Sequence, residues 1–305
     1  MPLVTVVIAT FKRPVMVTRA VSSALAQTMS DLEVIVAVEK GDDETIAALE
    51  AVADPRVRHV VNPVKSGPGP ARDTGARAGT GLWLAFLDDD DEWMPEKLEK
   101  QLALAADPAR TICTTLSRVV TPNGVFIRPS SPYDGKVPID EWLFDRLSWF
   151  KGGESMLQTS SLLVPRAMFE QLHFGQAHHE EWELAIRAVK QHGFRLVTVR
   201  EPLVTYYAGN TYPWRKSVGW IESMRDVVTP RAFSGFCLTV ATRALAPPDR
   251  NAAFLTFLRL GLRHGRPTAR QLFAFTLMWL LPQHLRERIR AVLRGREPAD
   301  DSRAA

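Results

Sequence analysis

Short apolar segments alternate with amphipathic stretches over the first 110 residues. Residues 3–10, 32–38 and 57–61 are rich in Val and Ile, which is typical of strands, and a fourth apolar segment spans residues 82–87. Helical patterns separate these segments, at residues 14–27, 44–52 and 71–78. Because strands that alternate with helices usually pair in parallel, the pattern predicts an α/β fold with a mostly parallel, doubly wound sheet.

The pattern changes after a predicted helix at residues 95–106. Residues 111–120 and 126–127 predict two strands joined by a turn at Asn123-Gly124, and further strands are predicted at residues 160–164, 194–199 and 203–207. Helices are expected at residues 165–172 and 180–192. We therefore expect antiparallel strands to join the parallel sheet. Residues 129–158 show no clear periodicity, and we expect a mobile lid or an acceptor loop there.

The C-terminal part of the chain has a different character. We expect two parts, an α/β domain at residues 1–210 and a helical, Arg-rich extension at residues 211–305. Helices are predicted in the extension at residues 251–264, 268–281 and 283–294. Its strongest apolar run, residues 272–281, is far shorter than the roughly 20 residues that a membrane-spanning helix needs. This run is therefore not expected to cross a bilayer alone.

The extension also carries the basic charge of the chain. Residues 243–296 contain eleven Arg but only two acidic residues, whereas the whole chain has a net charge of +4. No nucleic-acid-binding motif accompanies these arginines, so no nucleic-acid partner is predicted. Because Arg alternates with apolar side chains, we expect a helix at a membrane surface with Phe273, Phe275 and Trp279 toward the lipid. A helical cap on the first domain and a contact in a homodimer fit the same pattern.

The composition is that of a globular protein, with 46% hydrophobic and 24% charged residues. Cys113 and Cys237 are too few for a disulfide framework or a zinc site, and we expect both to pack as small apolar residues. The first residues lack a basic region and a cleavage site, so no signal peptide is expected. Together these features predict a cytoplasmic protein, with peripheral attachment at the inner face of the membrane as an option.

Four consecutive aspartates at residues 88–91 follow the fourth apolar segment directly. Ligands of open α/β sheets bind beyond the carboxyl ends of the strands, where these carboxylates are expected to lie. Carboxylates repel phosphates unless a cation separates them, and Mg²⁺ prefers one or two carboxylates together with substrate phosphates. The segment therefore predicts a metal–diphosphate site. A helix start near Pro95 would explain Asp91 and Glu92, but not four adjacent charges.

Four motifs resemble, in the expected order, those of the family 2 glycosyltransferases with the GT-A fold. They lie within about residues 3–207 and read V-T-V-V-I-A-T-F-K-R-P, E-V-I-V-A-V-E-K-G-D-D-E-T, G-P-A-R-D-T-G with L-D-D-D-D-E-W, and H-H-E-E-W-E-L-A-I-R. The resemblance implies an inverting, metal-dependent transferase that moves a sugar from a nucleoside-diphosphate donor, expected to be UDP-linked, to a hydroxyl of the acceptor. The basic, aromatic tail favours a lipid-linked saccharide of envelope polysaccharide synthesis as that acceptor.

The resemblance also implies site residues. Asp90 matches the family's ligand of a divalent cation, Mg²⁺ or Mn²⁺. Glu39 stands where the family usually has an Asp that contacts the pyrimidine, and its longer side chain leaves the preferred nucleotide open. The nucleotide-binding positions implied by the resemblance are Ala9, Thr10, Phe11, Arg13, Glu39, Arg72, Asp88 and Asp89.

The catalytic base is expected in the acidic motif at residues 180–183. Glu181 matches the family's Asp position, and its neighbour Glu180 is the other candidate. A carboxylate there would take the proton of the acceptor hydroxyl as it attacks the anomeric carbon. His178 and His179 have no partner at metal-ligand spacing and are expected to be structural. Trp182 is expected either to stack on a sugar or to pack in the core.

The sequence fits two other enzyme classes of similar α/β design less well. A nucleotidyltransferase is expected to have a Gly-rich loop with a Lys after the first strand, and a dinucleotide-dependent dehydrogenase is expected to have G-x-G-x-x-G there. Residues 9–14 contain no Gly, which argues against both classes. A non-catalytic nucleotide-sugar-binding or scaffold protein of the same fold remains an alternative, because Glu replaces Asp at both position 39 and position 181.

Overall fold

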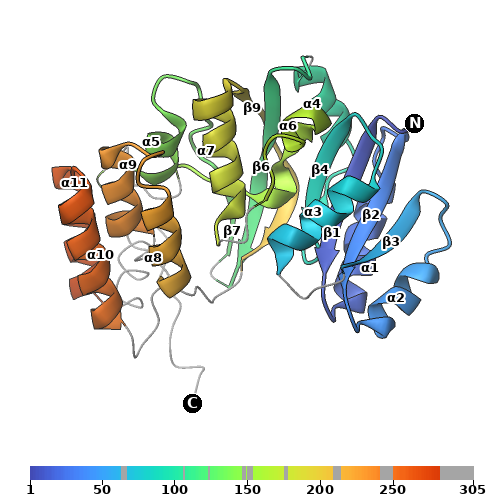
Figure 1. Cartoon of the computed structure of the whole chain (residues 1–305), viewed down its shortest axis with the longest axis horizontal. Coiled ribbons are helices and arrows are strands. Elements are labelled where there is room, and N and C mark those ends of the chain that lie inside the picture. The colour runs from blue at the N-terminus through green and yellow to red at the C-terminus, as the bar shows by residue number, and fades with distance from the viewer. Residues whose placement is uncertain are drawn as a thin grey trace.

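The computed structural model describes residues 1–62, 67–105, 107–122, 124–145, 149, 154–174, 178–208, 214–240 and 250–281. In these residues one sheet of nine strands runs through the molecule in the order β3-β2-β1-β4-β8-β6-β9-β5, and β7 pairs with β6. The β3 edge of the sheet lies at one end of the molecule, and the C-terminal helices lie at the other end (Figure 1).

The first half of the sheet is parallel, as the sequence predicts. Strands β3, β2, β1 and β4 pair in parallel, and their carboxyl ends meet at one edge. Residues of β1, β2 and β4 are buried almost without exception, because helices cover both faces. These strands are β1 (Val4–Thr10), β2 (Leu32–Glu39), β3 (Val57–Asn62) and β4 (Trp83–Asp88).

Alternate residues of β1 face the two layers of helices. Ile8 belongs to one apolar cluster together with Val21 of α1, whereas Val7 belongs to the other cluster together with Ala76 of α3. Helix α3 packs closely on the sheet, since a Cβ at Gly75 would lie 2.7 Å from a methyl group of Val7. The helices of this half are α1 (Pro14–Leu25), α2 (Asp43–Glu50), α3 (Pro68–Ala78) and α4 (Lys97–Ala105).

Antiparallel strands extend the sheet, again as predicted. Strand β8 lies antiparallel between β4 and β6, β9 pairs in parallel with β6, and the short β5 is antiparallel to β9. The predicted strands at residues 194–199 and 203–207 are one strand, β9, with an irregular register opposite Leu116. The strands are β5 (Glu92–Trp93), β6 (Thr111–Thr121), β7 (Gly124–Arg128), β8 (Leu163–Pro165) and β9 (Arg195–Tyr207).

Two predicted elements around residue 165 are shorter than expected. The strand predicted at residues 160–164 starts only at Leu163, because Thr159–Ser161 form a 3₁₀ turn (η1) whose serine hydroxyls make buried hydrogen bonds. The helix predicted at residues 165–172 is limited to α6 (Arg166–Phe169). Polar side chains thus replace strand pairing next to the carboxyl end of β4.

The C-terminal helices share a hydrophobic core with the sheet. Phe144 of α5 and Trp220, Phe236, Phe254 and Phe275 of the later helices belong to the same cluster as Phe86 of β4. The division at residue 210 stays a prediction. The helices are α5 (Ile139–Phe144), α7 (Glu180–His192), α8 (Trp214–Ser223), α9 (Pro230–Gly235), a π-helical turn η2 (Phe236–Val240), α10 (Arg250–His264) and α11 (Ala269–Leu280).

The expected orientation of the tail is wrong in one respect. Phe275 is buried and its ring packs on Phe254 of α10, so it does not face outward as a membrane helix would require. Trp279 also packs on Phe254 but is only partly buried. Phe273, by contrast, is 41% exposed. No helix among the described residues is both long and apolar enough to span a bilayer. The helix predicted at residues 283–294 lies outside the described residues.

Part of the segment at residues 129–158 is a buried helix and not a loop, whereas a lid or acceptor-binding role of the remainder stays a prediction. Helix α5 lies within this segment, and Trp142 and Phe144 are buried in the core because the C-terminal helices cover them. Residues 146–148 and 150–153 lie outside the described part. Cys113 and Cys237 are free and buried, as predicted.

Candidate active site

The four aspartates form a tight turn at the end of β4. Asp88 ends the strand, and the backbone N–H of Asp91 donates to the C=O of Asp88 at 3.1 Å. Asp89 and Asp90 therefore occupy the two corners of the turn, which we call the aspartate turn (residues 88–91). The side chain of Asp90 is 38% exposed, whereas that of Asp89 is almost fully buried.

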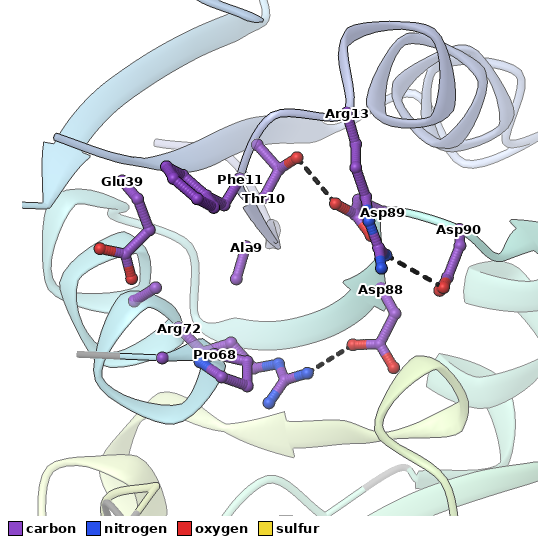
Figure 2. Close-up of a pocket in the computed structure, with 12 residues that line it drawn as sticks. Ala9, Thr10, Phe11, Arg13, Glu39, Pro68, Arg72, Asp88, Asp89 and Asp90 are labelled. Atoms are coloured by element: carbon purple, nitrogen blue, oxygen red, sulfur yellow. Dashed lines mark hydrogen bonds and ion pairs between the residues drawn. The ribbon is translucent and has the colours of Figure 1, made fainter. Parts of the chain in front are cut away.

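A cavity of about 420 Å³ opens beside this turn (Figure 2). Its walls come from the loops after β1 and β2, from the start of α3 and from the turn itself. Every residue implied to bind nucleotide, and the implied metal ligand Asp90, lines this one cavity. The full set of lining residues is Ala9, Thr10, Phe11, Arg13, Glu39, Gly67, Pro68, Ala71, Arg72, Asp88, Asp89 and Asp90.

One end of the cavity carries a buried acceptor. Glu39 ends β2 and pairs in register with Asn62 at the end of β3, whose Nδ2 donates to Glu39 Oε1 at 3.3 Å. Glu39 Oε2 is buried, and no described residue donates a hydrogen bond to it. A buried acceptor without a donor is costly, so this oxygen suits a ligand N–H. Asn62 was not singled out from the sequence, although it stands at the end of a predicted strand.

The other end of the cavity is formed by three charged side chains. Arg13 Nη1 donates to Asp89 Oδ1 at 2.9 Å and to Asp90 Oδ2 at 3.2 Å, and Thr10 Oγ1 donates to Asp89 Oδ2 at 2.7 Å (Figure 2). Burial raises the pKa of Asp89, although Thr10 and Arg13 oppose this effect. The partners of Asp89 hold its carboxylate in a fixed orientation at the cavity wall.

Arg72 joins the cavity to the acidic motif. Its side chain is buried, Nη2 donates to Asp88 Oδ1 at 2.5 Å, and Nη1 donates to Glu180 Oε1 at 2.7 Å. Burial alone would lower the pKa of Arg72, but the two carboxylates together raise it above its ordinary value. The guanidinium therefore stays charged and ties the first turn of α7 to the end of β4.

Glu181 lies next to this ion pair without taking part in it. Burial, followed by the neighbouring carboxylate of Glu180, raises the pKa of Glu181 to about 8. Glu180 and Glu181 do not line the cavity themselves, but Glu180 contacts Arg72, which does. A carboxylate with a raised pKa is a stronger base. Of the two candidates for the proton acceptor, Glu181 therefore fits that role better than Glu180, which is paired with Arg72.

The neighbouring histidine and tryptophan have structural contacts. The ring of His179 stacks on that of Trp182 with centroids 4.4 Å apart, and His179 Nε2 lies 3.1 Å from Ser217 Oγ. Burial lowers the pKa of His179 to about 2, so the imidazole is neutral. Trp182 Nε1 donates to the C=O of Leu157. One face of the Trp182 ring is thus covered by His179, which favours the packing role over sugar stacking.

The residues at the turn suit a cation only together with a ligand's own oxygens. Among the residues that the structure describes, no group of three or more His, Cys, Asp or Glu side chains is arranged to hold a metal ion. Mg²⁺, however, typically takes one or two protein carboxylates and completes its shell with water and phosphate oxygens. The partly exposed carboxylates of Asp90 and Asp88 fit that donor set.

Sequence and structural comparisons place the chain among sugar transferases. The sequence model described as Glycosyl transferase family 2 matches residues 5–172, which is more than half of the chain. The chain is 36% identical over 127 residues to the succinoglycan biosynthesis protein ExoO of Rhizobium meliloti, a match that covers 42% of this chain and 36% of ExoO. It is 25% identical over 232 residues to the amylovoran biosynthesis glycosyltransferase AmsB of Erwinia amylovora, covering 68% of this chain and 74% of AmsB.

A third relative is named for its substrates. It is WfgD of Escherichia coli, a UDP-Glc:alpha-D-GlcNAc-diphosphoundecaprenol beta-1,3-glucosyltransferase, which is 29% identical over 33% of this chain and 40% of its own length. The chain thus spans less than half the length of ExoO and of WfgD in these matches.

Solved structures support the same fold. The mannosyltransferase PcManGT from Pyrobaculum calidifontis, in complex with GDP-Man and Mn²⁺, aligns with a TM-score of 0.58 at 18% identity, covering 96% of this chain and 84% of PcManGT. TarS from S. aureus, in complex with UDP, aligns with a TM-score of 0.55 at 16% identity, covering 86% of this chain and 71% of TarS. With the family match and this fold in agreement, the chain belongs to glycosyl transferase family 2 and has the GT-A fold.

Proposed function

We propose that this glycosyltransferase moves a sugar from a UDP-sugar to a hydroxyl group of a lipid-linked saccharide, with inversion at the anomeric carbon. The observation that carries the proposal is the buried Arg72 bridge, which places the acidic start of α7 beside a cavity suited to a nucleoside diphosphate. The bridge supports the proposal because Glu181, the candidate base, follows the bridged Glu180 directly in the first turn of α7.

The proposed nucleotide is uridine diphosphate. The buried Glu39 Oε2 needs a donor, and uracil offers one at its N3–H, whereas cytosine has an acceptor at the same position. TarS, whose structures hold UDP and UDP-GlcNAc, supports this choice, and WfgD is named for UDP-Glc. PcManGT holds GDP-Man, and guanine also presents an N–H, so a GDP-sugar is the competing donor in the test.

Glu181 is the proposed catalytic base. Its raised pKa of about 8 makes the ionised form of Glu181 a stronger base toward the proton of the acceptor hydroxyl, while Glu180 is already paired with Arg72. The hydroxyl oxygen forms the new bond to the anomeric carbon as the bond from that carbon to the diphosphate oxygen breaks on the opposite side. The electron pair of the broken bond leaves with the diphosphate, and the displacement inverts the configuration.

The departing diphosphate needs charge compensation. Arg13 is half exposed at the aspartate turn, and its guanidinium can turn toward a phosphate. Asp90, with Asp88, would hold a Mg²⁺ or Mn²⁺ ion together with phosphate oxygens, and that ion would supply Lewis-acid stabilisation of the leaving group. The Mn²⁺ bound with GDP-Man in PcManGT supports this proposal.

The acceptor proposal rests on relatives and on one surface of the protein. WfgD is named for an acceptor on diphosphoundecaprenol, as is a glucosyltransferase of Campylobacter jejuni. Helix α11 carries an apolar outer face, defined by Leu272, Phe273, Leu277 and Leu280, each at least 36% exposed. Residues 250–281 contain five Arg and no Asp or Glu. An apolar helix face in such a basic setting suits an anionic lipid surface, where a lipid-linked acceptor would be held.

Release of UDP tests the transfer reaction. Purified protein is incubated with UDP-, GDP- and CDP-sugars, with Mn²⁺ or with a chelator, and free nucleotide is measured. We expect metal-stimulated release from a UDP-sugar.

Glu181→Gln should lower transfer to an acceptor about 10²–10⁴-fold. Glu183→Gln is the matched control, because Glu183 lies on the same helix but pairs with Arg187 and Trp220. Equal transfer by the parent and Glu181→Gln would remove the base assignment, and no release from any donor would favour the binding-protein alternative.

Co-sedimentation with vesicles tests the membrane surface. We expect binding to vesicles rich in anionic lipid, weakening with added salt, and little binding to neutral vesicles. Leu277→Glu should abolish sedimentation, whereas Leu104→Glu, which alters an exposed leucine on α4, should leave it unchanged. If neither the parent nor Leu104→Glu sedimented with the vesicles, the proposed membrane surface would be refuted. A concentration-dependent dimer that is lost in Leu277→Glu would instead assign the apolar face of α11 to a second copy of the chain.

A further inference from the structure

The fourth aspartate of the turn has an environment unlike those of the other three. Asp91 is fully buried, does not line the cavity, and accepts three hydrogen bonds. Ser160 Oγ and Gln158 Nε2 both donate to its Oδ2 at 2.6 Å, and the backbone N–H of Tyr207 donates to its Oδ1 at 3.3 Å. Asp91 therefore ties the turn to η1 and to the end of β9.

Ser160 links both ends of the aspartate turn. Its Oγ accepts from the backbone N–H of Asp88 at 3.0 Å and donates to Asp91 Oδ2. The N–H of Asp91 in turn donates to the C=O of Asp88. One hydroxyl thus closes a ring of hydrogen bonds around the first and last residues of the turn, and the corner residues Asp89 and Asp90 project from that ring.

This hydroxyl stands where strand pairing has stopped. Ala85 of β4 still pairs with Leu163 of β8, and the N–H of Phe86 donates to the C=O of Leu162. Beyond that point the chain curls into η1, so no backbone carbonyl takes the N–H of Asp88, and Ser160 accepts it instead. The side chain of Ser160 fixes the direction in which β4 delivers the turn.

We propose that Ser160 and Asp91 form a clamp that positions the aspartate turn, and with it the carboxylate of Asp90, for a divalent cation that accompanies the diphosphate of the donor. Ser160 and Asp91 are positioning residues and do not touch the substrate. The role at the diphosphate rests on the proposed function, but the clamp itself is independent of it. Ser161 offers a matched control, because it is equally buried in η1 but bonds to Thr114 Oγ1 and the C=O of Gln158.

Hydrogen exchange and kinetics test the clamp together. In Ser160→Ala the N–H of Asp88 loses its acceptor, so amide exchange in a peptide covering the turn should accelerate about tenfold, the ratio that corresponds to one lost hydrogen bond. UDP release should fall about 10–100-fold in kcat/KM, chiefly through a higher KM for the donor with Mn²⁺. Ser161→Ala should change neither value. Asp91→Asn keeps an oxygen toward Ser160 and should retain most activity, whereas Asp91→Ala should resemble Ser160→Ala.

Each outcome decides one part of the proposal. Unchanged exchange in Ser160→Ala would show that there is no clamp. Faster exchange with equal kinetics in Ser160→Ala and Ser161→Ala would reduce the clamp to a structural contact and overturn the positioning role. If the parent releases no nucleotide from any donor, the proposed function and the positioning role both fail, while the exchange data still decide whether the clamp exists.

Discussion

Replacing Arg72 by Met is expected to destabilise the protein strongly. The substitution keeps most of the side-chain volume but removes the only guanidinium that the structure places between Asp88 and Glu180. Removing one partner of a buried ion pair typically costs about 3–5 kcal/mol, because the remaining charge stays buried without compensation. The side chain of Asp88 is 26% exposed and can be partly hydrated, whereas that of Glu180 is only 10% exposed. We therefore expect a loss of about 3 kcal/mol near neutral pH.

The loss should depend on pH in a defined direction. In the variant, Glu180 stays buried without its cation, so its pKa in the folded state should rise above that in the unfolded chain. A carboxyl group with a raised pKa supports folding at low pH, and this support disappears as the pH rises through that pKa. The deficit relative to the parent should thus be larger near pH 8 than near pH 5.

Urea unfolding at both pH values measures this effect. Arg58→Met is the control, because Arg58 is 51% exposed and its ion pair with Glu33 should contribute at most about 1 kcal/mol. The reasoning would be refuted if Arg72→Met and Arg58→Met had equal unfolding free energies, or if the deficit of Arg72→Met grew toward low pH.

Three further predictions concern single side chains. With Glu181 as the base and its pKa at about 8, kcat/KM for transfer should rise as the pH increases through about 8, and a flat profile from about pH 6.5 to 9 would contradict this assignment. Lys97 is buried against Gln101 and the ring of Trp93, and burial lowers its pKa to about 7. The parent should therefore lose stability as the pH falls from about 10 to 7. In urea unfolding, Lys97→Met should lack this pH dependence. Glu39→Gln places an amide at the buried end of the cavity. In binding titrations this variant should reduce the ratio of the affinity for UDP to that for CDP about tenfold, whereas an unchanged affinity ratio would show that the nucleobase binds elsewhere.

The sequence predicts the parallel half of the fold well, since its strands are buried on both faces and their apolar runs have no competing periodicity. Predictions fail where side chains replace backbone pairing. Residues 160–162 have strand-like composition, yet the serines satisfy their hydroxyl groups in η1 and pairing begins only at Leu163. Phe275 was misplaced for a related reason: an apolar helix face has the same periodicity whether α10 or a lipid covers it.

The candidate site was predictable as a set of positions but not as a set of contacts. The family resemblance supplied the residues that line the cavity, and the structure adds their partners. Asn62 and Ser160 carry no motif of their own and gain importance only through Glu39 and the aspartate turn. Gly67, which directly precedes α3 and has φ of 91°, enters the cavity wall through long-range folding that no local pattern encodes.

Four adjacent carboxylates can coexist at one strand end because the turn directs three of them to different sets of partners. Asp88 is paired with Arg72, Asp89 with Thr10 and Arg13, and Asp91 with hydroxyl, amide and backbone donors. The carboxylate of Asp90 bonds to Arg13, which it shares with Asp89, and 38% of its side chain is exposed. Mutual repulsion is thus offset by a cation at Asp88 and at Asp89, whereas Asp91 has neutral donors, and burial together with the charges of Asp88 and Asp90 raises its pKa to about 8. The charge of Asp90 is left at the cavity mouth. It follows that neutralising Asp90 should weaken a cation-dependent step without loosening the turn, whereas neutralising Asp88, the partner of the buried Arg72, should disturb the fold and the site together.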